Sequence, residues 1–293
     1  MSAVAPRLTL RTGGRLRRRR IVNRIMEAFG TAAALLAVGV LVLVIISVAV
    51  RGAPALSWHF LTTPPSLFGP PGGISSAIIG SALIIGMATA MALPVGVLGA
   101  VYLTELAPHR VAGVVQLCLD ILNGMPTIVT GIFVYGLLVV GHVQSAFAAA
   151  FALAIVMLPL VARATQEVLL LVPQSLREAS FALGVSKWRT TVGVVLPTTL
   201  GGVLTGTVVA IARAAGETAP LLFTCSIFAP AVSTDVTHAL PNIPVLIFTY
   251  SEQPDKALHA QAWAAALVLM AFVLLASLLA RVLLARQRSK LAR

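Results

Sequence analysis

The sequence predicts an all-α integral membrane protein with six transmembrane helices. Of its 293 residues, 58% are hydrophobic and 10% are charged, and the mean hydropathy is +0.98. An ordinary soluble domain carries about 25% charged residues, so a water-soluble fold is excluded. Apolar stretches that could cross about 30 Å of hydrocarbon recur along the chain. They predict helices at about 28–50, 74–101, 114–140, 146–168, 196–225 and 262–284.

The first helix follows an arginine-rich flank of the kind that precedes a secretory signal sequence. Its apolar run covers residues 28–50, whereas the apolar part of a cleaved signal is about 7–15 residues long. We therefore expect a membrane anchor that is retained.

Breaks and interruptions mark the apolar stretches that follow. The uncharged stretch 74–104 is too long for one perpendicular span, and Pro94 predicts a kink or an emerging end. A polar break at 141–145 divides the third helix from the fourth, and the fifth is interrupted by Arg213 and Glu217.

The basic residues predict the orientation in the membrane. Of the 21 Lys and Arg residues, 18 fall on one side, Arg51 and Lys256 lie in the opposite loops, and Arg213 lies within a helix. The positive-inside rule then places both termini in the cytoplasm. We expect a multi-pass protein of the cytoplasmic (inner) membrane that contacts lipid and no nucleic acid. Its parts are a cytoplasmic basic arm at 1–27, a transmembrane domain at 28–284 and a basic tail at 285–293.

Several functions are excluded by what the sequence lacks. It contains no Gly-Lys pair, so no Walker phosphate loop can form, and its His, Cys and acidic residues show no metal-ligand spacing. Cys118 and Cys225 lie in apolar runs and suggest packing rather than a disulfide framework. No serine is framed as a catalytic nucleophile. We therefore expect a chain that is not an enzyme, has no metal and holds no cofactor.

The loop at about 173–197 predicts a short amphipathic helix in the cytoplasm. Pro173 suits the first turn, Ser175 with Glu178 has the spacing of a capping box, and Gly184 can end the helix in a left-handed conformation. An alternative is a helix that lies on the lipid headgroups. Three residues are expected to share one face of this helix, namely Leu176, Ala179 and Leu183.

This loop resembles the EAA loop of ATP-binding-cassette (ABC) importer permeases. Ser180 replaces the second alanine of that motif. The resemblance implies a type I importer permease core and a coupling helix that seats in a separate ATPase subunit, where ATP and magnesium would bind. The matching residues, which the resemblance assigns to ATPase coupling, are Glu178, Ala179, Gly184, Val194, Leu196 and Pro197.

Further segments resemble the PstA permease family of ATP-driven phosphate importers. They are residues 213–221, 123–131, 61–65 and 72–74, and the likeness covers most of 51–250. It implies a phosphate permease with three kinds of partner: a second, PstC-like permease, PstB-like ATPases and a PstS-like extracytoplasmic binding protein. The alternatives are an ABC permease for another solute, such as molybdate or sulfate, and an ion-coupled secondary carrier. No inverted repeat supports the carrier.

The fifth helix predicts part of a translocation path. A stripe of small residues, which allows close approach of another helix, is flanked by Arg213 and Glu217, so both side chains are expected to point into the bundle. Ionisable residues at membrane depth mark functional paths, and a guanidinium suits an oxyanion. The alternative is an i, i+4 ion pair that merely neutralises both charges. The stripe consists of Gly202, Gly206, Ala210 and Ala214.

Further candidates for this path and its hinges are Asp120, Pro126, Gly216 and Pro220. Asp120 could pair with Arg213 across the bundle or cap a broken segment. Pro126 and Pro220 each free a backbone carbonyl one turn earlier, which predicts breaks in the third and fifth helices and a hinge at 216–220.

Overall fold

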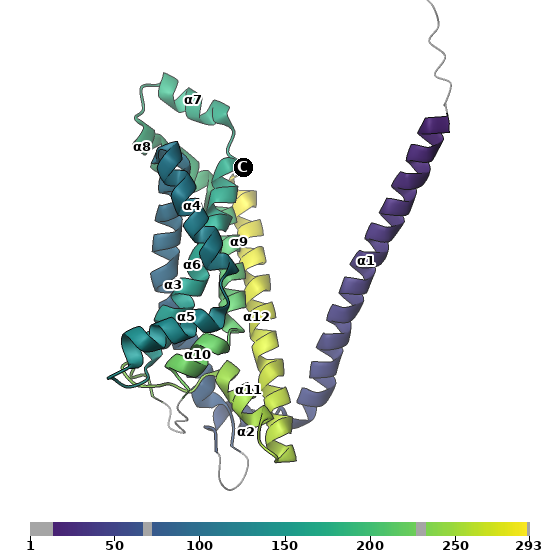
Figure 1. The fold of residues 1–293 in the computed structure, drawn as a ribbon, viewed down its shortest axis with the longest axis vertical. Helices are drawn as coiled ribbons and strands as arrows, with labels where there is room; N and C mark the ends of the chain where they lie inside the picture. Colours follow the sequence, from purple (N-terminus) through teal and green to yellow (C-terminus); the bar gives the residue numbers. More distant parts are fainter. Residues whose placement is uncertain (1–13, 67–71, 227–232, 292–293) are drawn as a thin grey trace, which may run out of the picture. The chain divides into compact units, whose positions relative to one another are not determined.

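The computed structural model describes residues 14–66, 72–226 and 233–291, and over these residues the chain contains helices and no strand (Figure 1). It divides into two compact units, residues 1–50 and 51–293.

Helix α1, Gly14–Gly52, accounts for the described residues of the first unit and ends two residues beyond it. The helix begins well before the predicted start at residue 28, so residues 14–27 of the basic arm are helical, while residues 1–13 lie outside the described part. Its apolar window is not buried within the chain at all. A helix that is apolar on all sides is stable where lipid or other helices surround it.

The second unit contains eleven α-helices among the described residues. They are α2 (Trp58–Thr62), α3 (Ser75–Val101), α4 (His109–Gly124), α5 (Thr127–Val134), α6 (Ala146–Leu170), α7 (Gln174–Ala182), α8 (Lys187–Thr190), α9 (Leu196–Ala215), α10 (Ala219–Thr224), α11 (Ile243–Ser251) and α12 (Lys256–Leu291). A 3₁₀ turn, η1 (Ala53–Ala55), precedes α2. Three wider π-helical turns extend or join them, namely η2 (Tyr102–Leu106), η3 (Tyr135–Val139) and η4 (Thr191–Val195).

The number of spans agrees with the prediction once one bent pair is counted as a span. Within the described residues, five helices are long and apolar enough to cross a membrane, and α4 with α5–η3 makes a sixth that is bent by 98°. The bend follows Met125, whose extended backbone is what a residue before proline prefers. Pro94, by contrast, lies inside α3 without interrupting it.

Helix α6 lies at the centre of the second unit, between α3 and α9 (Figure 1). The packing relies on small residues. A Cβ placed on Gly206 would lie 2.3 Å from the Ala164 Cβ, and one on Gly202 would lie 2.4 Å from the Val168 Cγ1. Ala210 and Ala214 are fully or almost fully buried. The small-residue stripe therefore packs against α6 as predicted, because without side chains in the way two backbones can approach closely.

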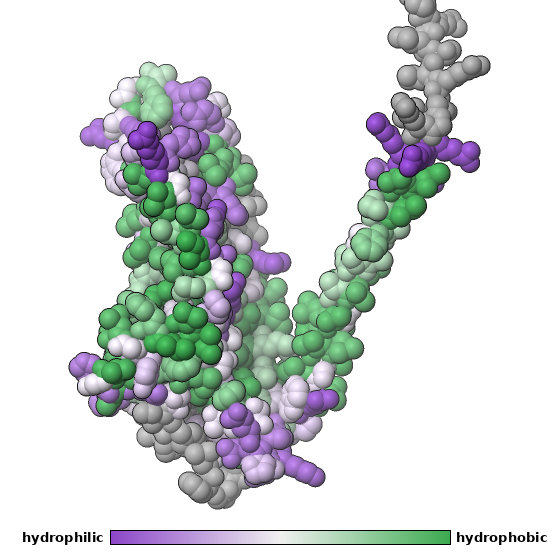
Figure 2. Space-filling view, viewed as in Figure 1, coloured by the Kyte–Doolittle hydropathy of each residue, from purple (hydrophilic) through white to green (hydrophobic). Residues whose placement is uncertain are grey.

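The outer side of α4 and α5 is apolar and uncovered within this chain. Figure 2 shows hydrophobic side chains along this side, and hydrophilic ones gathered around α7 and α8. The exposed apolar residues include Val114, Leu117, Ile121, Ile132 and Phe133. Such a surface suits lipid or another transmembrane subunit.

Candidate coupling loop and translocation path

The candidate coupling helix α7 begins two residues earlier than the capping box predicts. Pro173 is the N-cap, with extended backbone angles, and its carbonyl accepts from the Leu176 N–H at 3.2 Å. Ser175 therefore lies inside the first turn, and the expected capping box with Glu178 does not form. The predicted capping box was wrong because Pro173, whose φ is fixed, is the N-cap, and this leaves Ser175 inside the helix.

The other end of α7 is as predicted. Gly184 has a φ of +74°. Its N–H donates to the Phe181 carbonyl at 2.9 Å, and the Val185 N–H donates to the Ser180 carbonyl at 3.2 Å. This pair of bonds is the Schellman arrangement, which needs a left-handed residue that glycine adopts without strain. The helix end is therefore set by local backbone bonds.

The predicted apolar face of α7 is exposed to the surroundings. Leu176, Ala179 and Leu183 are all exposed, and Leu183 most of all at 83%. Glu178 is exposed as well. The face is therefore free to receive a partner.

The remaining EAA residues lie beyond α7. Val194 is in the π turn η4, and Leu196 and Pro197 are the first two residues of α9, which continues from η4. The motif thus runs from the exposed helix α7 into the candidate span Lys187–Ala215.

Sequence reasoning missed a buried ion pair beneath α7. The Arg177 Nη2 donates to the Glu105 Oε1 of η2 at 2.8 Å, with the two side chains 12% and 8% exposed. Arg177 also donates to the carbonyls of Val172 at 2.6 Å and Leu169 at 3.0 Å. The sequence offered one signal, a single glutamate at the end of a long uncharged helix.

The fifth predicted helix is broken as expected. Helix α9 ends at Ala215, Gly216 caps it, and α10 begins at Ala219 with Pro220 in its first turn. Within this break, the Arg213 Nε lies 3.7 Å from the Glu217 Oε1.

Arg213 does not point into this chain's bundle, contrary to the prediction. Its side chain is 51% exposed, while that of Glu217 is 17% exposed. The reason is that Ala210 and Ala214 occupy the side of α9 that faces the core, so Arg213 lies at the edge of the packed stripe.

Asp120 pairs with Arg163 of α6, not with Arg213. The two predicted proline breaks, however, are brought together. A Cβ on Gly131 of α5 would lie 2.8 Å from the Pro220 Cα of α10, so the segments after Pro126 and Gly216 pack on each other.

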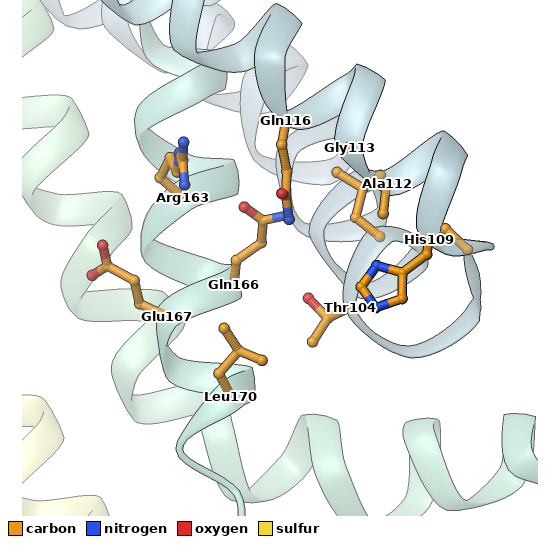
Figure 3. A pocket seen from close by; sticks show the side chains of 11 residues that line it. Thr104, His109, Ala112, Gly113, Gln116, Arg163, Gln166, Glu167 and Leu170 are labelled. Carbon is orange, nitrogen blue, oxygen red and sulfur yellow. The ribbon is translucent and has the colours of Figure 1, made fainter.

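A polar cavity of about 320 Å³ lies between η2, α4 and α6. Figure 3 shows the amide groups of Gln116 and Gln166 pointing toward each other, with the Arg163 and Glu167 side chains also on the α6 side. Its polar lining residues are Thr104, His109, Gln116, Arg163, Gln166 and Glu167. The cavity offers hydrogen-bonding groups to a small polar solute, and its one guanidinium, that of Arg163, is paired with Asp120. Among the described residues, no cluster of three or more His, Cys, Asp or Glu side chains could hold a metal ion.

Solved structures with a similar fold are ABC importers. A bacterial ABC transporter involved in the import of the acidic polysaccharide alginate aligns with a TM-score of 0.59 at 16% identity, covering 91% of this chain and 99% of that one. An inward-facing MetNI methionine ABC transporter aligns with a TM-score of 0.56 at 20% identity, covering 72% and 95%. These likenesses concern the fold, which is that of a type I ABC importer permease.

Sequence comparisons identify the family. The family of the "Binding-protein-dependent transport system inner membrane component" matches residues 92–289. The phosphate transport system permease protein PstA of Yersinia pestis is 40% identical over 275 residues, covering 92% of each chain. The protein of that name from Haemophilus influenzae is 36% identical over 266 residues, covering 90% of this chain and 94% of its own. This chain therefore belongs to the binding-protein-dependent inner membrane components and, among them, to the PstA permeases.

Proposed function

We propose that this chain is the permease subunit of an ATP-driven importer of inorganic phosphate, in which it forms half of the translocation path. The observation that carries the proposal is the match to a phosphate transport permease over 92% of both chains. The exposed helix α7 and the polar cavity beside α6 provide the parts that such a subunit needs.

The proposed importer contains three other kinds of subunit. The exposed face of α7, with Glu178 and Ala179, would seat in a PstB-like ATPase, which holds ATP and magnesium. A PstC-like second permease would cover the exposed faces of this chain, and a PstS-like binding protein would deliver phosphate from outside. In this proposal, ATP hydrolysis takes place on the ATPase subunit, and this chain converts it into movement of its helices.

The translocation path would run along the side of α9 where Arg213 is exposed. A charged side chain facing lipid at membrane depth costs at least about 2.5 kcal/mol. A second permease against this side would remove that cost and leave Arg213 and Glu217 lining the space between subunits. Asp120, paired with Arg163 beside the polar cavity, would lie further along the same path. The breaks at Pro126, Gly216 and Pro220 would act as hinges.

We further propose that both termini are cytoplasmic, with the basic arm at 1–27 and the tail at 285–293 flanking a permease domain at 28–284. A reporter fused after Arg293 should be active in the cytoplasm, and one inserted near Ser233 should be active outside. Either reporter active on the opposite side would contradict this topology.

The proposed substrate is tested by uptake. The chain would be expressed with its neighbouring subunits in a bacterium that lacks its own phosphate importers, and uptake of labelled phosphate, sulfate and molybdate would be compared. We expect phosphate uptake at micromolar concentrations and no uptake of the other two. Uptake of sulfate or molybdate without phosphate would refute the proposal.

A further inference from the structure

The Arg177 guanidinium joins three parts of the chain. It reaches from α7 to the Glu105 carboxylate in η2 at 2.8 Å, and to the carbonyls of Leu169 and Val172 at and just after the end of α6. The last carbonyls of a helix have no partner within the helix, and a cation placed there also opposes the helix dipole. One side chain therefore connects α7 with the ends of both α3–η2 and α6.

Helix α7 has few other polar connections to the rest of the chain. Among the described residues, the other hydrogen bond that its side chains make outside the loop's own turns joins the Ser180 Oγ to the Thr190 Oγ1 at 2.8 Å. Thr190 ends α8, which leads through η4 into α9. The two connections lead to different spans: Ser180 leads to α9, and Arg177 leads to α3 and α6.

Glu105 lies where α3 changes its helical pitch. The turn η2 has wider hydrogen bonds than an α-helix, as between the Ala107 N–H and the Tyr102 carbonyl at 2.8 Å. Wide turns of this kind are frequent at functional sites. The carboxylate is buried and paired, so removing either partner leaves a buried charge without compensation. The pair is thus costly to separate.

We propose that Arg177 and Glu105 are positioning residues that pass the movement of the coupling helix α7 to α3 and α6. The inference rests on the proposed function, in which an ATPase subunit moves α7. Neither residue touches the transported solute or ATP. When α7 is displaced, the guanidinium pulls η2 and the end of α6 with it, and these spans line the polar cavity that contains Gln166. The movement of the ATPase therefore reaches the cavity through the Arg177 side chain, by its ion pair with Glu105 and its bonds to the end of α6.

The test compares transport with hydrolysis in the assembled importer. Glu105→Gln and Arg177→Gln would be reconstituted in vesicles with the partner subunits, and phosphate uptake and ATP hydrolysis would be measured together. Glu252→Gln and Arg110→Gln, at exposed positions, serve as matched controls. We expect the Glu105 and Arg177 variants to keep the ATPase bound while uptake per ATP hydrolysed falls about tenfold, within the usual range of coupling between sites. The controls should keep the wild-type ratio.

A distance measurement separates transmission from folding. Spin labels at Tyr102 and at Gln174, which is exposed at the start of α7 and lies away from its apolar face, report the separation of η2 and α7. In the wild type we expect the distance between the two labels to be the same with and without ATP. In Glu105→Gln we expect this distance to change when ATP is added. If the Glu105→Gln chain itself does not insert in the membrane, Glu105→Asp, which keeps the charge one methylene shorter, replaces it.

Each outcome decides the inference. An unchanged ratio of uptake to hydrolysis, or loss of the ATPase from the variant alone, would overturn it, because the pair would then be dispensable or would serve folding only. If the wild-type chain does not bind the ATPase or take up phosphate, the proposed function itself fails.

Discussion

Replacing Gly206 by alanine should destabilise this chain, because Gly206 lies against Ala164 with no room for a Cβ. The new Cβ would lie 2.3 Å from the Ala164 Cβ. Ordinary contact between such atoms needs about 3.5–4 Å, so the two helices must separate by more than 1 Å. Neither partner is the end of a flexible side chain, and Ala210 in the next turn is fully buried. The strain therefore spreads along the interface.

The magnitude follows from a matched control. Gly86→Ala in α3 adds the same methyl group where no atom lies within 4 Å. Both substitutions gain helix propensity of up to about 1 kcal/mol, so their difference isolates the clash. Overpacking of a well-packed core costs about 1–3 kcal/mol, and we expect Gly206→Ala to be less stable than Gly86→Ala by that amount. Gly202→Ala should destabilise about as much as Gly206→Ala, because its new Cβ would lie 2.4 and 2.6 Å from the two γ carbons of Val168, and a valine inside a helix has one strongly preferred rotamer.

The assay is reversible unfolding of the purified chain in mixed micelles, followed by circular dichroism as the fraction of denaturing detergent rises. Equal stability of Gly206→Ala and Gly86→Ala would refute the close packing of α6 against α9. It would also remove the physical basis for the stripe of small residues.

Three other predictions concern separate parts of the chain. Gly184→Ala should weaken ATPase binding and phosphate uptake, because a left-handed residue with a Cβ costs about 1–2 kcal/mol; Gly184→Asn should be milder, and wild-type binding in both would contradict the helix end described here. Arg213→Gln combined with Glu217→Gln should assemble but import little phosphate, and recovery to wild-type uptake would reduce the pair to mutual neutralisation. Hydrogen bonds from Thr237, first from its hydroxyl and then from its N–H, lower the pKa of Asp235 from 3.8 to about 2. The lowered pKa stabilises the folded loop at pH values above the unfolded pKa of 3.8, and this stabilisation is lost as pH falls through about 2. The protection factor of the Thr237 amide, which removes the intrinsic pH dependence of the exchange rate, should therefore be constant above pH 4 and fall below it; a fall already near pH 6 would contradict this bond.

Sequence reasoning predicted well what depends on local chemistry or on composition. Apolar length gave the spans, Gly184 gave the end of α7, and Pro126 and Pro220 gave breaks. The end of α7 and the two breaks depend on glycine and proline, whose backbone preferences are nearly independent of their surroundings.

The failures concern pairings over long distances. Asp120 could not be assigned to Arg163, nor Glu105 to Arg177, because nothing in one sequence states which ends of helices meet. The exposure of Arg213 was predicted wrongly for a related reason. The stripe of small residues identifies the packed side of α9, but a side chain at the edge of that side can point into the bundle or out of it. The capping box at Ser175 failed because a neighbouring proline set the first turn.

The fixed ends of α7 have a consequence for how strongly a partner subunit can bind. A free peptide of nine residues would be mostly unfolded in water, and ordering it on a partner would cost about 1–2 kcal/mol for each residue. In this chain the proline cap, the glycine turn and the Arg177 contacts hold the helix in shape before any partner arrives. The entropy loss has thus already occurred when the chain itself folds. An incoming subunit meets a helix that is already formed, so the free energy of its contacts is not reduced by the cost of ordering that helix.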